Sequence, residues 1–128
     1  MDNSIIVTNN KLVFDKYKES MEVDYLEDMN YLNILCYVRD RIHQGHKLLT
    51  HPLSGSIKPN ETPYKSIIIS KNKQNLDEKG LIIIEESILT ARKFLENKAT
   101  PNWTDRVLND FMIIDLSLIE NVIDKLER

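Results

Sequence analysis

The chain has 128 residues, of which 41% are hydrophobic and 29% are charged, and its formal net charge is -3. A chain of this length buries roughly 65% of its unfolded surface, so we expect a single α/β domain over residues 1–128 that folds without disulfides or metal. The acidic balance argues against a nucleic-acid partner, and one cysteine cannot form an internal disulfide. Because no apolar run approaches about 18 residues and no charged-then-apolar leader is seen, we expect a cytoplasmic protein without a membrane partner.

The first strand-like segment is residues 4–10, SIIVTNN, a β-branched apolar run that ends at two asparagines. It predicts a buried strand followed by a helix that Asn9 or Asn10 caps. Residues 21–28 alternate apolar and polar side chains, which predicts a second strand nearer the edge of the sheet.

A helix is predicted from Asp28 or Asn30 to about Gln44. Gly45 follows at the position where a left-handed C-terminal cap is expected. The residues expected on the inner face of this helix are Tyr31, Leu35, Val38 and Ile42.

Residues 47–50 and 66–70 predict a third strand and a central fourth strand, the latter apolar on both faces. The remainder predicts two helices, one capped by Asn75 or Asp77 and the last beginning at Thr104. The inward residues expected in the last helix are Leu108, Phe111, Met112, Leu116, Ile119, Val122, Ile123 and Leu126. Together these segments predict a small three-layer α/β sandwich with a largely parallel four-stranded sheet and a helical C-terminal half.

This topology predicts where a ligand would bind. In open parallel sheets, ligands bind beyond the carboxyl ends of the strands. If the first, third and fourth strands run parallel, that edge gathers polar groups suited to a polar ligand. The groups are Thr8, Asn9 and Asn10, then residues 50–54, then Ser70 and Asn72.

The segment of residues 45–66 contains two of the three glycines and three of the four prolines. Connections longer than roughly 12 residues are uncommon unless they are functional, and the prolines restrict this one. Ser54, Gly55 and Ser56 can turn backbone N–H groups inward as an anion nest, with Lys58 supplying charge. The alternative is a rigid surface loop with turn residues where turns need them.

Arg39 lies near the apolar face of its helix on a helical projection, so its side chain either reaches out to solvent or meets an anion. Arg39, His51 and a serine hydroxyl would surround a carboxylate or phosphate, with arginine making a two-pronged contact and histidine a switchable proton. The candidate ligand-binding residues are therefore Asn9, Asn10, Arg39, His51, Ser54, Gly55, Ser56 and Lys58.

The three histidines, at H-x2-H-x4-H spacing, could in principle hold zinc. The chain turns at Gly45 between His43 and His46, and no acidic or cysteine ligand is adjacent, so we expect no metal. Both histidines can instead be explained by a favourable contact with the helix dipole at a helix C-terminus. Cys36 falls among apolar helical residues and is expected to be an inert core thiol. No nucleophile elbow, dinucleotide fingerprint or Walker loop indicates a reaction or a cofactor.

The strings IVTNN and VRDRIHQGHKLLTHPLSGSIKPNETPYKSIIIS resemble the GrdX family, small proteins encoded beside glycine, sarcosine and betaine reductase components in amino-acid-fermenting anaerobes. The resemblance extends over residues 5–70, and the helical remainder is similar in length and character. It implies an accessory role in the selenoprotein-dependent reductase pathway, with no assigned activity and no catalytic residues to carry over.

Three functions stay open. The chain could bind a small anionic ligand, or it could be an enzyme on an amino-acid-derived or phosphorylated substrate with His51 as general acid or base. It could also be an interaction protein whose proline-rich loop docks to a reductase subunit. The last helix is apolar on more than one stripe around Phe111 to Ile114, which also leaves pairing with a second copy as a homodimer open.

Overall fold

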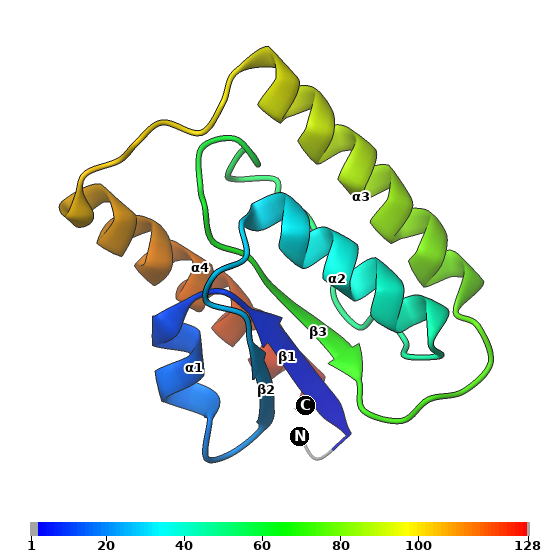
Figure 1. Cartoon of the computed structure of the whole chain (residues 1–128). Coiled ribbons are helices and arrows are strands. Elements are labelled where there is room, and N and C mark those ends of the chain that lie inside the picture. Colours follow the sequence, from blue (N-terminus) through cyan, green and yellow to red (C-terminus); the bar gives the residue numbers. More distant parts are fainter. Residues whose placement is uncertain (1–2, 128) are drawn as a thin grey trace.

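The three strands form one open sheet in the order β2-β1-β3 in the computed structural model, which describes residues 3–127 (Figure 1). β1 (Ser4–Thr8) is the central strand. It pairs in parallel with β2 (Glu22–Tyr25) and antiparallel with β3 (Ser66–Ser70). The prediction of a second strand at the sheet edge is therefore confirmed.

The prediction of a largely parallel four-stranded sheet is wrong. β3 runs against β1, and residues 47–50 make a single antiparallel bridge, from Leu48 to Ile69, in place of a strand. These residues still lie along the outer edge of β3, where Leu49 N donates to Ile68 O at 2.9 Å. Because residues 47–50 cover its outer side, β3 has the apolar sequence of a central strand although it is an edge strand of the sheet. An apolar segment specifies burial on both faces but not its direction.

The reversed direction of β3 changes which residues meet at the site. The carboxyl end of β1 lies beside the amino end of β3, with Thr8 opposite Ser66. Ser70 and Asn72 were expected beside the carboxyl end of β1. They lie instead at the opposite end of the strands, because Ser70 ends the antiparallel strand β3 and Asn72 follows it.

Four helices complete the fold: α1 (Lys11–Tyr17), α2 (Tyr31–His43), α3 (Glu78–Asn97) and α4 (Asp105–Leu126). Each begins after a residue whose side chain accepts a hydrogen bond from a backbone N–H of the first turn, as the N-cap preference requires. These caps are Asn10, Asn30, Asp77 and Thr104, all among the predicted candidates. The positive φ of Gly45, 109°, confirms its left-handed conformation after α2.

The helices cover both faces of the sheet, so the three-layer arrangement is confirmed (Figure 1). α2 and α3 lie side by side on one face, where Ile5, Val7 and Ile67 join them in the larger core. α1 and α4 cover the other face, against Ile6 and Ile68. Because strand side chains alternate, every apolar residue of β1 and β3 is buried on one face or the other.

α4 extends past the sheet that it covers. Its 22 residues span ~33 Å, whereas a five-residue strand spans only ~17 Å. Ile119 and Ile123 are buried, but Leu126 is exposed, so the prediction that it points inward is wrong. Ile113 and Ile114 are also exposed. Within residues 3–127, no helix combines the length and the apolar character that crossing a membrane needs.

Candidate functional site

The carboxyl end of β1, the amino end of β3 and the middle of α4 meet in a group of buried polar side chains. We call this group the strand-end cluster, and each member exposes 7% or less of its surface. Its members are Thr8, Asn10, Lys65, Ser66 and Asp115. Buried polar groups need partners, so the cluster can be followed bond by bond.

The Asp115 carboxylate is the acceptor on which the cluster converges. Its Oδ2 accepts from Ser66 Oγ at 2.7 Å and from Asn10 Nδ2 at 3.0 Å. Since the Ser66 hydroxyl donates to this carboxylate, Thr8 Oγ1 must donate in the 2.7 Å bond that joins it to Ser66 Oγ. Thr8 Oγ1 in turn accepts from Asn10 N at 3.0 Å. These bonds form a continuous chain from β1 through β3 to α4.

The two asparagines after β1 join several elements. Asn10 Oδ1 caps α1 by accepting from Leu12 N at 3.0 Å, while its Nδ2 also donates to Met112 O of α4 at 2.9 Å. Asn9 Nδ2 donates to Met29 O and Pro63 O, both at 2.9 Å. Both side chains are therefore used to hold the ends of neighbouring elements.

Lys65 differs from the rest of the cluster. Its Nζ lies 5.7 Å from the centre of the Tyr31 ring, and it makes no hydrogen bond or ion pair with another residue in the described range 3–127. Burial lowers the pKa of Lys65, and the charge of Asp115 opposes that shift. Burial raises the pKa of Asp115, against the bonds from Asn10 and Ser66 and the charge of Lys65. Both groups therefore bear the cost of leaving water.

A cavity of about 200 Å³ opens beside the cluster. Its polar lining includes His51, Ser54, Lys65, Ser66 and Asp115, and its apolar lining includes Leu118, Ile119 and Val122 of α4. A second hollow of about 10 Å³ shares Ser54, Lys65, Asp115 and Leu118 with it. Lys65 and Asp115 thus face both spaces.

The structure brings two of the predicted loop residues to this cavity. His51 and Ser54 line it directly. The Oγ atoms of Ser54 and Ser56 lie 2.9 Å apart, and Ser56 N donates to Ser54 Oγ at 3.3 Å. The backbone N–H of Ser56 is therefore occupied within the loop. Gly55 is exposed, and a Cβ added there would have no neighbour within 4 Å.

Other predicted residues lie elsewhere. Arg39 pairs with Asp40 at 3.3 Å and with Glu85 of α3 at 3.8 Å, so it lies where α2 meets α3 and is not part of the cavity lining. The side chain of Lys58 is exposed, and its carbonyl accepts the backbone N–H of Glu61 at 3.0 Å in a turn.

Comparison with protein families assigns the chain. The family model described as GrdX-like protein matches residues 5–124. The chain belongs to this family. The match includes α3 and most of α4, so the GrdX-like family covers Asp115 as well as the loop and both asparagines. Neither the curated proteins nor the solved structures give a match.

Lys65, Ser66 and Asp115 were not among the predicted site residues of this GrdX-like chain. The sequence does carry a signal for Asp115, because it precedes Ile119 by four residues and Ile123 by eight. That spacing puts a carboxylate on the buried face of the helix. Lys65 gave no comparable signal, since a lysine before a strand is ordinary at a protein surface.

The three histidines have separate surroundings. His46 is 2% exposed; its Nδ1 donates to Ser70 O at 2.7 Å, so its Nε2 accepts from Arg41 Nη2 at 3.2 Å. His43 is exposed, and His51 Nδ1 lies 3.1 Å from Leu53 N and 3.2 Å from Leu53 O. In the part of the chain from 3 to 127, no group of three His, Cys, Asp or Glu side chains is placed to hold a metal.

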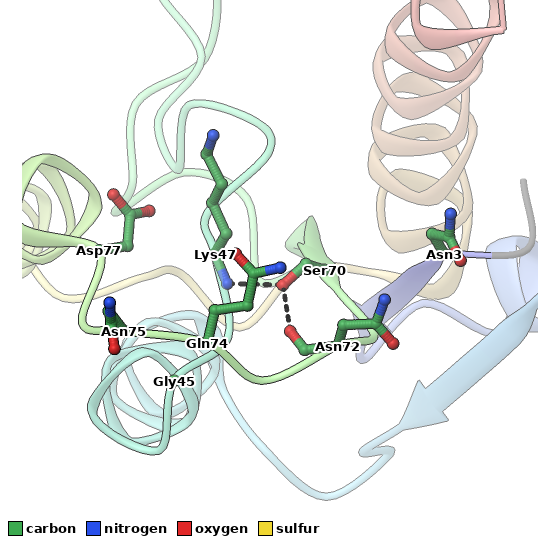
Figure 2. A pocket seen from close by; sticks show the side chains of 8 residues that line it. All are labelled: Asn3, Gly45, Lys47, Ser70, Asn72, Gln74, Asn75 and Asp77. Atoms are coloured by element: carbon green, nitrogen blue, oxygen red, sulfur yellow. Dashed lines mark hydrogen bonds between the residues drawn. The ribbon is translucent and has the colours of Figure 1, made fainter.

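A larger hollow, about 330 Å³, lies at the opposite edge of the sheet (Figure 2). Figure 2 shows Ser70 near its middle, with Asp77 and Asn3 toward opposite ends. Ser70 Oγ accepts from Lys47 N at 2.7 Å and donates to Asn72 O at 2.9 Å. Asp77 accepts from Leu48 N and caps α3, so these polar groups hold the surrounding loops together. The cavity beside Lys65 is the stronger candidate site.

Proposed function

We propose that this GrdX-like chain binds a small carboxylate in the cavity beside Lys65. The observation that carries the proposal is the burial of Lys65, which exposes 7% of its surface, without a hydrogen-bonded or ion-paired partner for its Nζ in residues 3–127. Buried charges in proteins are normally paired, and a contact with an aromatic ring contributes only about 0.5–2 kcal/mol. A ligand carboxylate at Lys65 would supply the missing partner.

The rest of the cavity narrows the class of ligand. Its volume of about 200 Å³ lies below the roughly 300–1,000 Å³ of common ligand pockets, which favours a molecule of few heavy atoms. Asp115 lines the same space and would repel the second charge of a phosphate dianion, whereas a monovalent carboxylate needs only one cation. The Ser54 hydroxyl and the His51 ring offer further polar groups, and the α4 side chains offer an apolar wall.

The test measures thermal stability and binding heat with acetate, butyrate, lactate and inorganic phosphate. We expect the carboxylates to raise the Tm of the natural chain and of Lys93→Met, a matched control on the exposed surface of α3. Lys65→Met should lose the response, and Lys65→Arg should keep part of it because it keeps the charge. Absence of any heat or Tm shift in the natural chain, or an undiminished response in Lys65→Met, would refute the proposal.

We propose, as a second candidate, an accessory association with a component of a glycine, sarcosine or betaine reductase. Its support is GrdX-like family membership together with the exposure of Gly55, Ser56 and Lys58 on a loop restricted by prolines. Mixing the purified chain with each reductase subunit tests it by gel filtration. Co-elution that Lys58→Glu weakens supports docking through this loop, and separate elution from every subunit contradicts it.

A further inference from the structure

Lys65 is set apart from every other lysine in residues 3–127. It is buried, whereas all the others are exposed. Its backbone is fixed at the sheet edge, because its N–H donates to Asn9 Oδ1 at 2.9 Å and its carbonyl accepts from Asn9 N at 3.4 Å. The side chain then lies between the Tyr31 ring and the cavity that it lines. This amine is held in one place beside an open space.

Burial shifts the equilibrium of Lys65 from the ammonium toward the neutral amine. In the described chain, no carboxylate lies within ion-pair distance of Nζ, and no acceptor fixes its protons. Burial among Tyr31 and the α4 side chains lowers the pKa of Lys65. Each unit by which a lysine pKa falls raises the neutral fraction at a given pH about tenfold. A desolvated lysine with a free lone pair is the form that attacks carbonyl carbons.

We infer that Lys65 is an amine nucleophile that forms an imine with a small 2-oxo acid held in this cavity. The inference rests on the proposed binding of a carboxylate, since the carboxylate first pairs with the ammonium of Lys65. The carbonyl carbon of a 2-oxo acid is bonded directly to its carboxylate, so that pairing brings the carbonyl carbon close to Nζ.

The chemical step balances without an oxidant or a reductant. The Lys65 ammonium first gives a proton to the Asp115 carboxylate. The neutral amine then donates its nitrogen lone pair to the carbonyl carbon, and Asp115 returns the proton to the carbonyl oxygen. Asp115 next takes a proton from the newly bonded nitrogen, which gives a carbinolamine. A second proton on that oxygen lets water leave as the C=N bond forms, so one amine and one carbonyl give one imine and one water. Asp115, whose carboxyl lines the same cavity, is the group placed to exchange these protons.

Reductive trapping tests the imine directly. The full chain is incubated near neutral pH with pyruvate or glyoxylate and sodium cyanoborohydride, which reduces an imine to a stable secondary amine, and peptide mass mapping locates the adduct. We expect the adduct on Lys65 to form at least about tenfold faster than adducts on the exposed lysines, because the cavity holds the 2-oxo acid beside Nζ. Because the exposed lysines of the same molecules are the reference, the result needs no variant. Adducts spread over the exposed lysines, with Lys65 no faster, would overturn the inference.

Two variants separate the imine from simple binding. Lys65→Arg keeps a positive charge but cannot form an imine, so it should lose the fast adduct, while Lys93→Arg should retain it on Lys65. If acetate raises the Tm of the natural chain but trapping at Lys65 is not enhanced, the imine is excluded and the proposed carboxylate binding stands. If none of acetate, butyrate and lactate affects the natural chain, the proposed function fails, and the inference fails with it.

Discussion

Replacing Asn10 by alanine should destabilise the fold more than the loss of an ordinary helix cap does. The side chain of Asn10 is fully buried and makes two kinds of contact. Loss of its bond from Leu12 N removes the cap of α1, which costs about 1 kcal/mol. Loss of its Nδ2 donor removes one of the bonds to the buried Asp115 carboxylate, which costs about 1–3 kcal/mol. We therefore expect Asn10→Ala to lower the free energy of unfolding by about 2–4 kcal/mol.

Urea unfolding followed by circular dichroism measures this loss, with an unchanged m-value as the sign that both states keep their compactness. Asn30→Ala is the matched control, because Asn30 caps α2 through its bond from Asn33 N but is exposed, so it should lose only about 1 kcal/mol. A double-mutant cycle with Asp115→Asn should give a coupling of about 0.5–3 kcal/mol. If Asn10→Ala costs no more than Asn30→Ala, the bond to Asp115 contributes nothing and the reasoning is wrong.

Three further predictions concern the site and the turn after α2. The folded-state pKa of Asp115 is raised above its ordinary value of 3.8, so the stability that this carboxyl contributes is lost as pH rises through the folded pKa. Urea midpoints of the natural chain should therefore fall relative to those of Asp115→Asn as pH rises above 3.8. The folded-state pKa of Lys65 is lowered below 10.5, so the natural chain should gain stability relative to Lys65→Met as pH rises toward that value, and equal pH profiles would contradict either shift. Gly45→Ala should cost about 1–3 kcal/mol in thermal unfolding, because φ is +109° and the new Cβ would lie 2.6 Å from Gln74 O; an unchanged Tm would show that the turn relaxes freely.

Features that depend on a few neighbouring residues could be predicted from the sequence. The caps at Asn10, Asn30, Asp77 and Thr104 are examples, since unpaired N–H groups in a first turn need a nearby side-chain acceptor. Gly45 is another, because only glycine adopts a positive φ without steric cost. In each case, the physical requirement lies within four residues of the one that satisfies it.

The direction of β3 could not be predicted in the same way. The segment SIIIS reads identically in both directions, and each direction buries isoleucines on both faces. The choice depends on the long connection after Gly45, whose residues 47–50 run along the outer edge of β3 before the chain returns. This error moved the expected site residues, because it exchanged Ser66 for Ser70 at the carboxyl end of β1.

The residues around the cavity illustrate a second limit. His51 and Ser54 were recognised because histidine and serine in a restricted loop indicate a site. Arg39 was included because it lies near an apolar face, but Glu85 of α3 supplies its counter-charge, and a helix projection cannot show a second helix. The position of Asp115 opposite Asn10 joins residues 105 positions apart, which only the tertiary fold brings together.

Comparison with Arg41, a half-buried basic side chain of the same fold, shows why Lys65 indicates a ligand. Arg41 Nη1 donates to Asp24 Oδ2 at 2.8 Å, and its Nη2 bonds to His46 at 3.2 Å, so its charge is neutralised and its terminal nitrogens are used inside the protein. Such a pair holds β2, α2 and the following loop together, although Arg41 Nε is buried without a hydrogen-bond partner. Lys65 is more deeply buried, yet its Nζ makes no hydrogen bond or ion pair in residues 3–127. It lies 5.7 Å from the centre of the Tyr31 ring, and Lys65 lines a cavity. An apolar side chain would fill that position at lower desolvation cost. The charge of Lys65 offsets part of the cost of burying Asp115, and a ligand that pairs or reacts with the amine gives a further reason for an ammonium there.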